Sequence, residues 1–138
     1  MRKVILISHA HMAKGIVSSV ELILGKQDNL EYLSAYVEGE PPFENELKKI
    51  IDGNKDNNLI ILTDLLGGSV NNEVISMIDG KDNIHLITGM NLILVISILL
   101  AEESNLPEQI NQIIDESRKG ILYFNDSNII QDEGLDDF

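Results

Sequence analysis

Short strand-like runs alternate with amphipathic helical patterns along almost the whole chain, and this alternation constrains the fold more than any other feature. The strand-like runs lie at 2–8, 30–37, 59–63 and 84–88. The helical patterns, in which apolar residues recur three and four positions apart, lie at 12–24, 43–53, 69–78, 90–103 and 107–120. Because strands separated by helices pair in parallel, the pattern predicts an α/β fold with an open, mainly parallel, doubly wound sheet and helices on both faces.

The first and third strand-like runs have uninterrupted apolar centres, which is typical of strands covered on both sides. We therefore expect them to be central neighbours, in the strand order 2-1-3-4. A last short strand is predicted at 121–124. A length of 138 residues is near the commonest size of one domain, which we place at 1–125. The acidic remainder, 126–138, contains no lysine or arginine and is expected to be a solvated, mobile tail.

The composition excludes several classes of function. The chain has 23 acidic and 10 basic residues, and its net charge of −13 would repel nucleic acid and anionic lipid. It has no cysteine, which excludes disulfides and thiolate zinc sites and fits a cytoplasmic location. The N-terminal apolar run is too short for a secretory signal. The uncharged stretch 84–101 approaches the length of a membrane span, but Gly89 divides it into a strand and a buried helix.

Two strands of the predicted sheet end in functional side chains. His9 follows the first strand, and Asp64 follows the third. Parallel sheets bind ligands beyond the carboxyl ends of their strands, where the strand order reverses, so we expect these side chains to meet there. A carboxylate on one imidazole nitrogen fixes the tautomer and stabilises the cationic ring that forms when the other nitrogen attacks phosphorus. The pair therefore predicts histidine chemistry, and above all phosphoryl transfer.

A phosphate cradle is predicted directly after Asp64. Gly67 and Gly68 allow backbone N–H groups to approach a phosphoryl group, and the following helix presents its positive end. Ser69 is expected to cap this helix and to offer its hydroxyl to phosphate. Each feature alone has an ordinary structural explanation, and only their coincidence indicates a site. Further residues expected at the rim of the site are Ala10, Thr63, Leu66 and Asn91.

Neither a metal nor a cofactor is expected. His9, His11 and Asp64 could approach one ion, but three ligands without a further carboxylate cluster form a poor set. His85 lies inside the fourth strand, where we expect it to be packed or hydrogen-bonded.

The motifs that carry these residues resemble the IIA component (EIIA domain) of the mannose-type (mannose, fructose, sorbose and N-acetylgalactosamine) sugar phosphotransferase system. The matching segments are 4–9 (VILISH), 63–69 (TDLLGGS) and 89–92 (GMNL), in the family's order and spacing within about 2–124. The resemblance implies a cytoplasmic phosphotransferase whose His9 accepts a phosphoryl group from the carrier HPr and passes it to the IIB component. Membrane components IIC and IID then complete sugar uptake.

The resemblance also implies residue roles and an assembly. Asp64 would orient the ring, so that Nε2 carries the phosphoryl group, and Gly68 and Ser69 would cradle it. The chain would form a homodimer in which residues 121–124 cross to the partner. Ala10 departs from the family, which often has glycine there, and Val70 and Ile93 stand where proline is common. These departures affect the rim and the helix starts rather than the chemistry.

Three other functions fit parts of the pattern. The phosphotransfer subunit of a dihydroxyacetone kinase shares the fold and the histidine, but its glycine element tends to read Asp-Leu-Gly-Ser. A regulatory module that transfers no phosphate would be expected to lose His9 or Asp64. A flavodoxin-like nucleotide-binding protein would need a glycine-rich loop after the first strand, and residues 9–12 contain no glycine.

Overall fold

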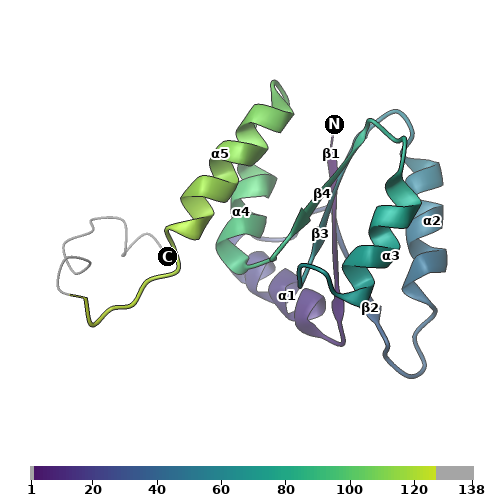
Figure 1. Cartoon of the computed structure of the whole chain (residues 1–138), viewed down its shortest axis with the longest axis horizontal. Helices are drawn as coiled ribbons and strands as arrows, with labels where there is room; N and C mark the ends of the chain where they lie inside the picture. Colours follow the sequence, from purple (N-terminus) through teal and green to yellow (C-terminus); the bar gives the residue numbers. More distant parts are fainter. Residues whose placement is uncertain (1, 127–138) are drawn as a thin grey trace.

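The computed structural model describes residues 2–126, which form four strands and five helices (Figure 1). The strands are β1 (Arg2–His9), β2 (Leu30–Ala35), β3 (Asn58–Thr63) and β4 (Ile84–Thr88). The helices are α1 (Met12–Leu24), α2 (Phe43–Gly53), α3 (Ser69–Ile78), α4 (Leu92–Leu100) and α5 (Leu106–Arg118). Strand and helix alternate as far as α4, as the sequence pattern predicts.

The sheet has the strand order β2-β1-β3-β4, and every neighbouring pair is parallel. This confirms the predicted order and makes β1 and β3 the central strands. In the register, Ile7 of β1 lies beside Thr63 of β3, and His9 lies beside Ala35 of β2. Consequently His9 and Asp64, the residue after Thr63, emerge at the same edge of the sheet.

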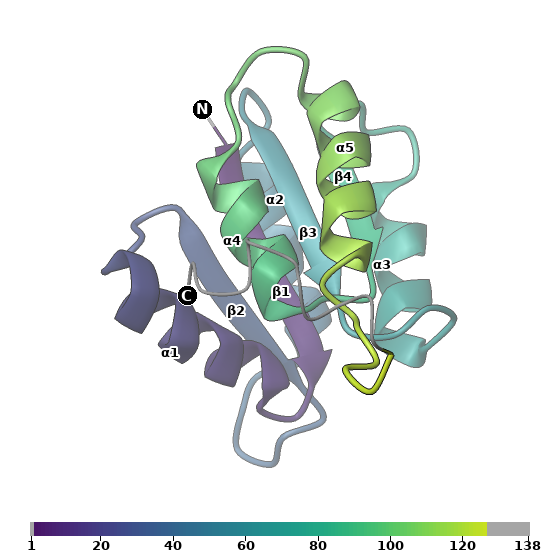
Figure 2. The same ribbon diagram turned by 90° about the vertical axis from the view of Figure 1, so that its left-hand side faces the viewer.

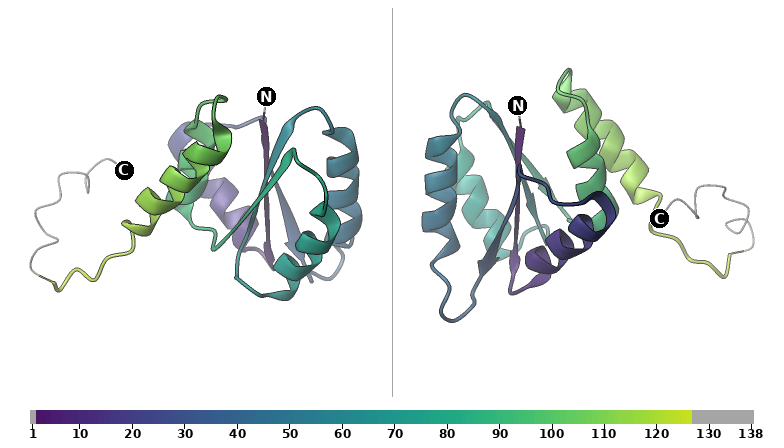
Figure 3. Two further views of the ribbon diagram at one scale, coloured as in Figure 1. Left: turned by 45° about the horizontal axis from the view of Figure 1, so that its top comes forward. Right: turned by 180° about the vertical axis from the view of Figure 1, so that it is seen from behind.

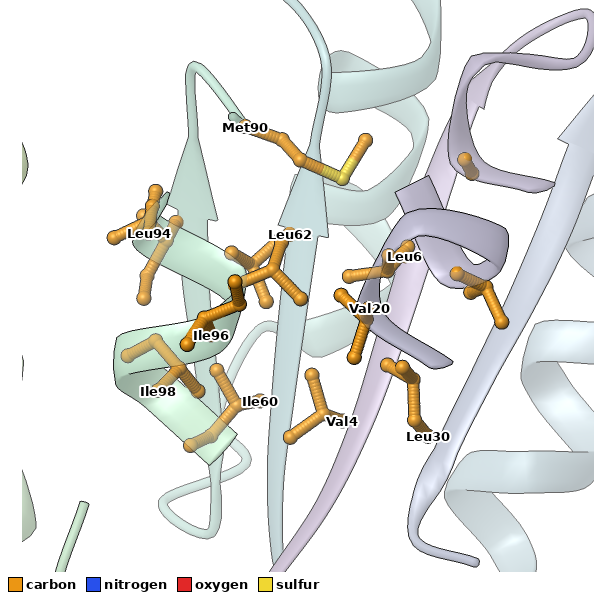
Figure 4. Close-up of a cluster of buried hydrophobic side chains, with 14 of the residues drawn as sticks. Val4, Leu6, Val20, Leu30, Ile60, Leu62, Met90, Leu94, Ile96 and Ile98 are labelled. Atoms are coloured by element: carbon orange, nitrogen blue, oxygen red, sulfur yellow. The ribbon is translucent and has the colours of Figure 1, made fainter. Parts of the chain in front are cut away.

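Alternate side chains of the central strands divide between two cores. Helices α1, α4 and α5 lie on one side of the sheet, and α2 and α3 lie on the other (Figures 2 and 3). Val4 and Leu6 point into the first core, whereas Ile5 and Ile7 point into the second. Figure 4 shows side chains of β1, β3, α1 and α4 converging in the first core. Burial on both sides explains why the central strands contain no polar residue at their centres.

Helix α4 explains the long uncharged stretch of the sequence. It lies between the sheet and α5, and Leu94, Val95, Ile96 and Ile98 are all buried. No helix within residues 2–126 has both the length and the apolar character needed to cross a membrane.

Three predicted elements end earlier than the sequence pattern indicates: the strand at 30–37, the helix at 90–103, which ends at Leu100, and the helix at 107–120, which is α5 and ends at Arg118. The strand predicted at 30–37 ends at Ala35, because Tyr36 has a φ of 62°, in the left-handed region that no strand tolerates. The helix predicted at 90–103 is α4, which begins at Leu92. The Asn91 side chain starts it by accepting a hydrogen bond from the Leu94 N–H at 2.9 Å.

The strand predicted at 121–124 is not formed in the single chain. This segment leads away from the end of α5 and the sheet, and no strand within residues 2–126 lies beside it (Figure 1). Its four apolar side chains are between 37% and 78% exposed. Of the tail expected at 126–138, all but Asp126 lies outside the described residues.

Candidate functional site

The carboxylate of Asp64 holds the imidazole of His9 at the carboxyl edge of the sheet. Asp64 Oδ2 accepts a hydrogen bond from the His9 backbone N–H at 2.7 Å and lies 2.7 Å from the ring nitrogen Nδ1. Asp64 Oδ1 accepts a third bond, from the Leu65 N–H at 2.9 Å. The Asp64 side chain is only 7% exposed, whereas that of His9 is 41% exposed. The carboxylate is therefore a fixed, buried support for a ring that solvent and partners can reach.

These hydrogen bonds decide which ring nitrogen is free. Burial acts to raise the pKa of Asp64, but the hydrogen bonds from the His9 backbone and ring, with that from Leu65, hold it below its ordinary value. Asp64 is thus ionised near neutral pH and can only accept hydrogen bonds. The neutral ring accordingly carries its proton on Nδ1 and presents the lone pair of Nε2 outward.

The turn after Asp64 brings the N-terminus of α3 to this free nitrogen. Gly67 has a φ of 73°, a conformation that glycine adopts without strain. A Cβ on Gly68 would lie 3.7 Å from Cε1 of His9, an ordinary van der Waals contact, so the backbone of Gly68 lies next to the imidazole ring. The first turn of α3 supplies N–H groups without partners inside the helix and the positive end of the helix dipole. An arrangement of this kind suits an anionic group beside Nε2.

The structure contradicts one of the two roles predicted for Ser69. The N-cap of α3 is Gly68, whose extended backbone precedes the helix, and no side chain caps it. The prediction that Ser69 is the N-cap is therefore wrong. As the first residue of the helix, Ser69 instead places its Oγ 3.5 Å from His9 Nε2, where the hydroxyl can reach a group bound to that nitrogen.

The rim residues divide into two groups. Leu66 is 83% exposed, and Ala10 is exposed with a φ of 50°, a conformation in which glycine is unstrained. Thr63 is fully buried and donates its hydroxyl to Asn71 Oδ1 at 2.7 Å, so its predicted place at the rim is wrong. Asn91 caps α4, and no hydrogen bond joins it to His9 in the described part of the chain.

Tyr36 belongs to the site, although the sequence analysis did not select it. Its ring centroid lies 5.4 Å from that of His9, and its hydroxyl donates a hydrogen bond to Ser69 Oγ at 2.9 Å. The sequence analysis missed it because the strand was expected to continue to residue 37, whereas β2 ends at Ala35 and Tyr36 directly follows it. The argument that selected His9 and Asp64 at strand ends applies equally to this residue.

The other two histidines lie apart from this cluster. His11 is exposed at the start of α1. His85 lies in β4, where burial lowers its pKa and its Nε2 lies 3.4 Å from Asn58 Oδ1, as expected for a packed strand residue. Within residues 2–126, no three His, Cys, Asp or Glu side chains gather closely enough to hold a metal ion.

Known proteins resemble this chain over almost its whole described length. The sequence model of the EIIA-man family, described as "PTS system fructose IIA component", matches residues 3–114. No curated protein sequence gives a significant match.

Solved structures agree with the family match. A Klebsiella pneumoniae protein, provisionally described as a phosphoenolpyruvate-dependent sugar phosphotransferase system (PTS) permease, is 36% identical, with a TM-score of 0.84 over 92% of this chain and 93% of its own. The phosphotransferase system component EIIA from Streptococcus agalactiae is 27% identical and has a TM-score of 0.74; the match covers 91% of this chain and 98% of that protein. A PTS IIA protein associated with the fucose utilization operon of Streptococcus pneumoniae is 26% identical and has a TM-score of 0.76; the match covers 90% of this chain and 93% of that protein. The chain belongs to the EIIA-man family, the mannose-type IIA components of the sugar phosphotransferase system.

Proposed function

We propose that this protein is a phosphocarrier that accepts a phosphoryl group from phospho-HPr on Nε2 of His9 and passes it to the IIB component. The observation that carries the proposal is the contact of Nδ1 with Asp64, which leaves Nε2 free beside the N-terminus of α3. Family membership supports the partners HPr and IIB, and indirectly the membrane components IIC and IID. Such a carrier would work in the cytoplasm, where HPr is found.

The proposed transfer needs little rearrangement of the site. The lone pair of Nε2 forms a bond to phosphorus as the bond from phosphorus to the donor histidine breaks, and the electrons of that bond return to the donor nitrogen. The proton on Nδ1 stays in place, so the ring becomes a cation that faces the carboxylate of Asp64. The negative phosphoryl oxygens meet the N–H groups of α3. Since a phosphohistidine replaces a phosphohistidine, catalysis consists mainly of in-line positioning.

Phosphorylation of the purified chain tests the proposal directly. The chain is incubated with phosphoenolpyruvate, enzyme I and HPr, and its intact mass is measured before and after mild acid. We expect a gain of one phosphoryl group that acid removes, because the phosphorus–nitrogen bond of phosphohistidine is labile to acid. No gain with an active cognate HPr would instead favour a regulatory module that keeps the fold without transferring phosphate.

We also propose that the protein is a homodimer in which residues 121–124 pair with the partner's sheet. Two observations support this. The segment carries four exposed apolar side chains, and β4 lies at the edge of the sheet. An unpaired edge strand is a template for a strand from another chain.

Molar mass in solution tests the dimer. Light scattering should give twice the mass of the chain, and the double substitution Leu122→Asp, Phe124→Asp should give monomers. The control is Leu22→Asp, which places the same charge at an 89% exposed leucine of α1 and should leave the dimer intact. A monomeric parent chain at micromolar concentration, or a double variant that stays dimeric, would contradict the proposed interface.

A further inference from the structure

The geometry points to Tyr36 as a positioning residue of the phosphoryl-transfer site, which holds the Ser69 hydroxyl ready for a phosphoryl group on Nε2 of His9. This inference rests on the proposed function and extends it to a residue outside the motifs of the sequence analysis. It is carried by three contacts of one side chain, with Ser69, with His9 and with Phe43.

The backbone places Tyr36 over the site. Its predecessor, Ala35, lies beside His9 in the β1–β2 register and accepts a hydrogen bond from the Ala10 N–H at 3.0 Å. The chain then leaves the strand at Tyr36, whose φ of 62° is uncommon for a residue with a side chain. The tyrosine is thus fixed one residue beyond Ala35, which pairs with His9 itself.

The Tyr36 ring lies between the imidazole and the second core. It is tilted by 48° to the His9 ring at a centroid distance of 5.4 Å, and it meets the Phe43 ring at 6.4 Å and 85°, an edge-to-face contact. Phe43 is only 3% exposed and belongs to the core between the sheet and α2. A ring that is itself 65% exposed is therefore anchored on one side by a buried one.

The hydroxyl group of Tyr36 determines where the Ser69 proton points. The tyrosine donates its only hydroxyl proton to Ser69 Oγ at 2.9 Å, so the serine must direct its own proton elsewhere. Ser69 Oγ lies 3.5 Å from Nε2, a long contact in the free protein. The oxygens of a phosphoryl group bonded to Nε2 can only accept hydrogen bonds, and they would lie closer to the Ser69 hydroxyl than Nε2 does. Donation from tyrosine to serine also polarises the serine O–H, which strengthens the bond that it donates.

Phosphorylation kinetics of Tyr36→Phe test this role, because phenylalanine keeps the ring and removes the hydroxyl. Two donors are compared: phospho-HPr, and phosphoramidate, a small donor that needs no docking surface. We expect the rate of phosphorylation to fall about fivefold with both donors, the equivalent of one hydrogen bond. In the Ser69→Ala background, Tyr36→Phe should have no further effect, since the hydroxyl acts through the serine. Tyr32→Phe, which removes a hydroxyl from the middle of β2, is the matched control and should keep the parent rate.

The possible outcomes separate the hypotheses. A loss with phospho-HPr alone would assign Tyr36 to partner docking and overturn the positioning role. Equal rates for Tyr36→Phe and the parent would overturn it as well, and so would additive losses in the double variant. A parent chain that accepts no phosphoryl group from either donor would refute the proposed function itself, and the role of Tyr36 with it.

Discussion

Replacing His9 with alanine should abolish phosphorylation of the chain while leaving it folded. Among the described residues of the site, Nε2 of His9 is the imidazole nitrogen that Asp64 leaves free, and an imidazole is a far better nucleophile than the neighbouring Ser69 hydroxyl. We expect the rate of phosphoryl acceptance to fall by at least about 10³-fold, measured as intact mass after incubation with phosphoenolpyruvate, enzyme I and HPr.

The fold should survive this substitution. The side chain of His9 is 41% exposed, and residue 9 keeps the backbone N–H that donates to Asp64. Loss of the ring contact should lower the free energy of unfolding by about 1 kcal/mol, which a urea titration can measure. The chain has only two other histidines, so His11→Ala and His85→Ala complete the set and should keep normal labelling. Labelling retained in His9→Ala but lost in His11→Ala would move the acceptor to His11.

Replacing Asp64 with asparagine should slow phosphoryl acceptance by about 100-fold without abolishing it, in the range expected for the loss of one charged partner of a reacting imidazole. Two effects act together. The neutral amide no longer stabilises the cationic ring that forms on transfer. The amide NH₂ group can also face Nδ1, which favours the tautomer with the proton on Nε2 and so removes the nucleophile.

A single-turnover assay with excess phospho-HPr measures this effect. Asp52→Asn is the matched control, because it makes the same change at an exposed carboxylate that accepts a hydrogen bond from Lys48 on α2. That variant should react at the parent rate. An unchanged rate in Asp64→Asn would show that the carboxylate supports the fold but does not orient the ring for transfer.

The same variant reports how Asp64 contributes to stability as the pH changes. The pKa of Asp64 in the folded chain lies below the ordinary value of 3.8, so the folded state holds this proton less tightly than the unfolded state does. The resulting stabilisation is present above 3.8 and is lost as the pH falls through the folded pKa. The difference in free energy of unfolding between the parent chain and Asp64→Asn should therefore shrink as the pH falls below 3.8. A difference that grows over this range would contradict the lowered pKa.

Much of the fold could be predicted because local pattern and burial agree in this chain. The continuous apolar centres of β1 and β3 indicate strands covered on both sides, and helices that alternate with them leave few topologies open. The boundaries of α1, α3 and β4 match the sequence pattern residue for residue. The end of β2 does not, because the left-handed turn at Tyr36 has no glycine or proline to mark it.

The site was predictable only in part, because a sequence pattern places residues along a strand but does not fix the contacts of their side chains. Strand ends place His9 and Asp64 at one edge of the sheet, but they do not determine which way a hydroxyl points. Thr63 lies next to Asp64 in the sequence, yet its side chain points into the core and bonds to Asn71. Successive side chains of a strand point to opposite faces, and the face that Thr63 shares is covered by α3, whose Asn71 accepts its hydroxyl proton.

The sequence by itself determined the alternation of strands and helices, the central place of β1 and β3, and the approach of His9 to Asp64. These follow from short-range periodicity and from the rule that parallel strands end at a common edge. The tertiary structure alone decided that one carboxylate oxygen serves both the backbone and the ring of His9, that Gly68 rather than Ser69 caps α3, and that Tyr36 reaches Ser69. The contacts of Asp64 with His9 and of Tyr36 with Ser69 join residues 55 and 33 positions apart, and a hydrogen bond forms only when the two atoms lie within a few tenths of an ångström of the right separation, which no local pattern encodes.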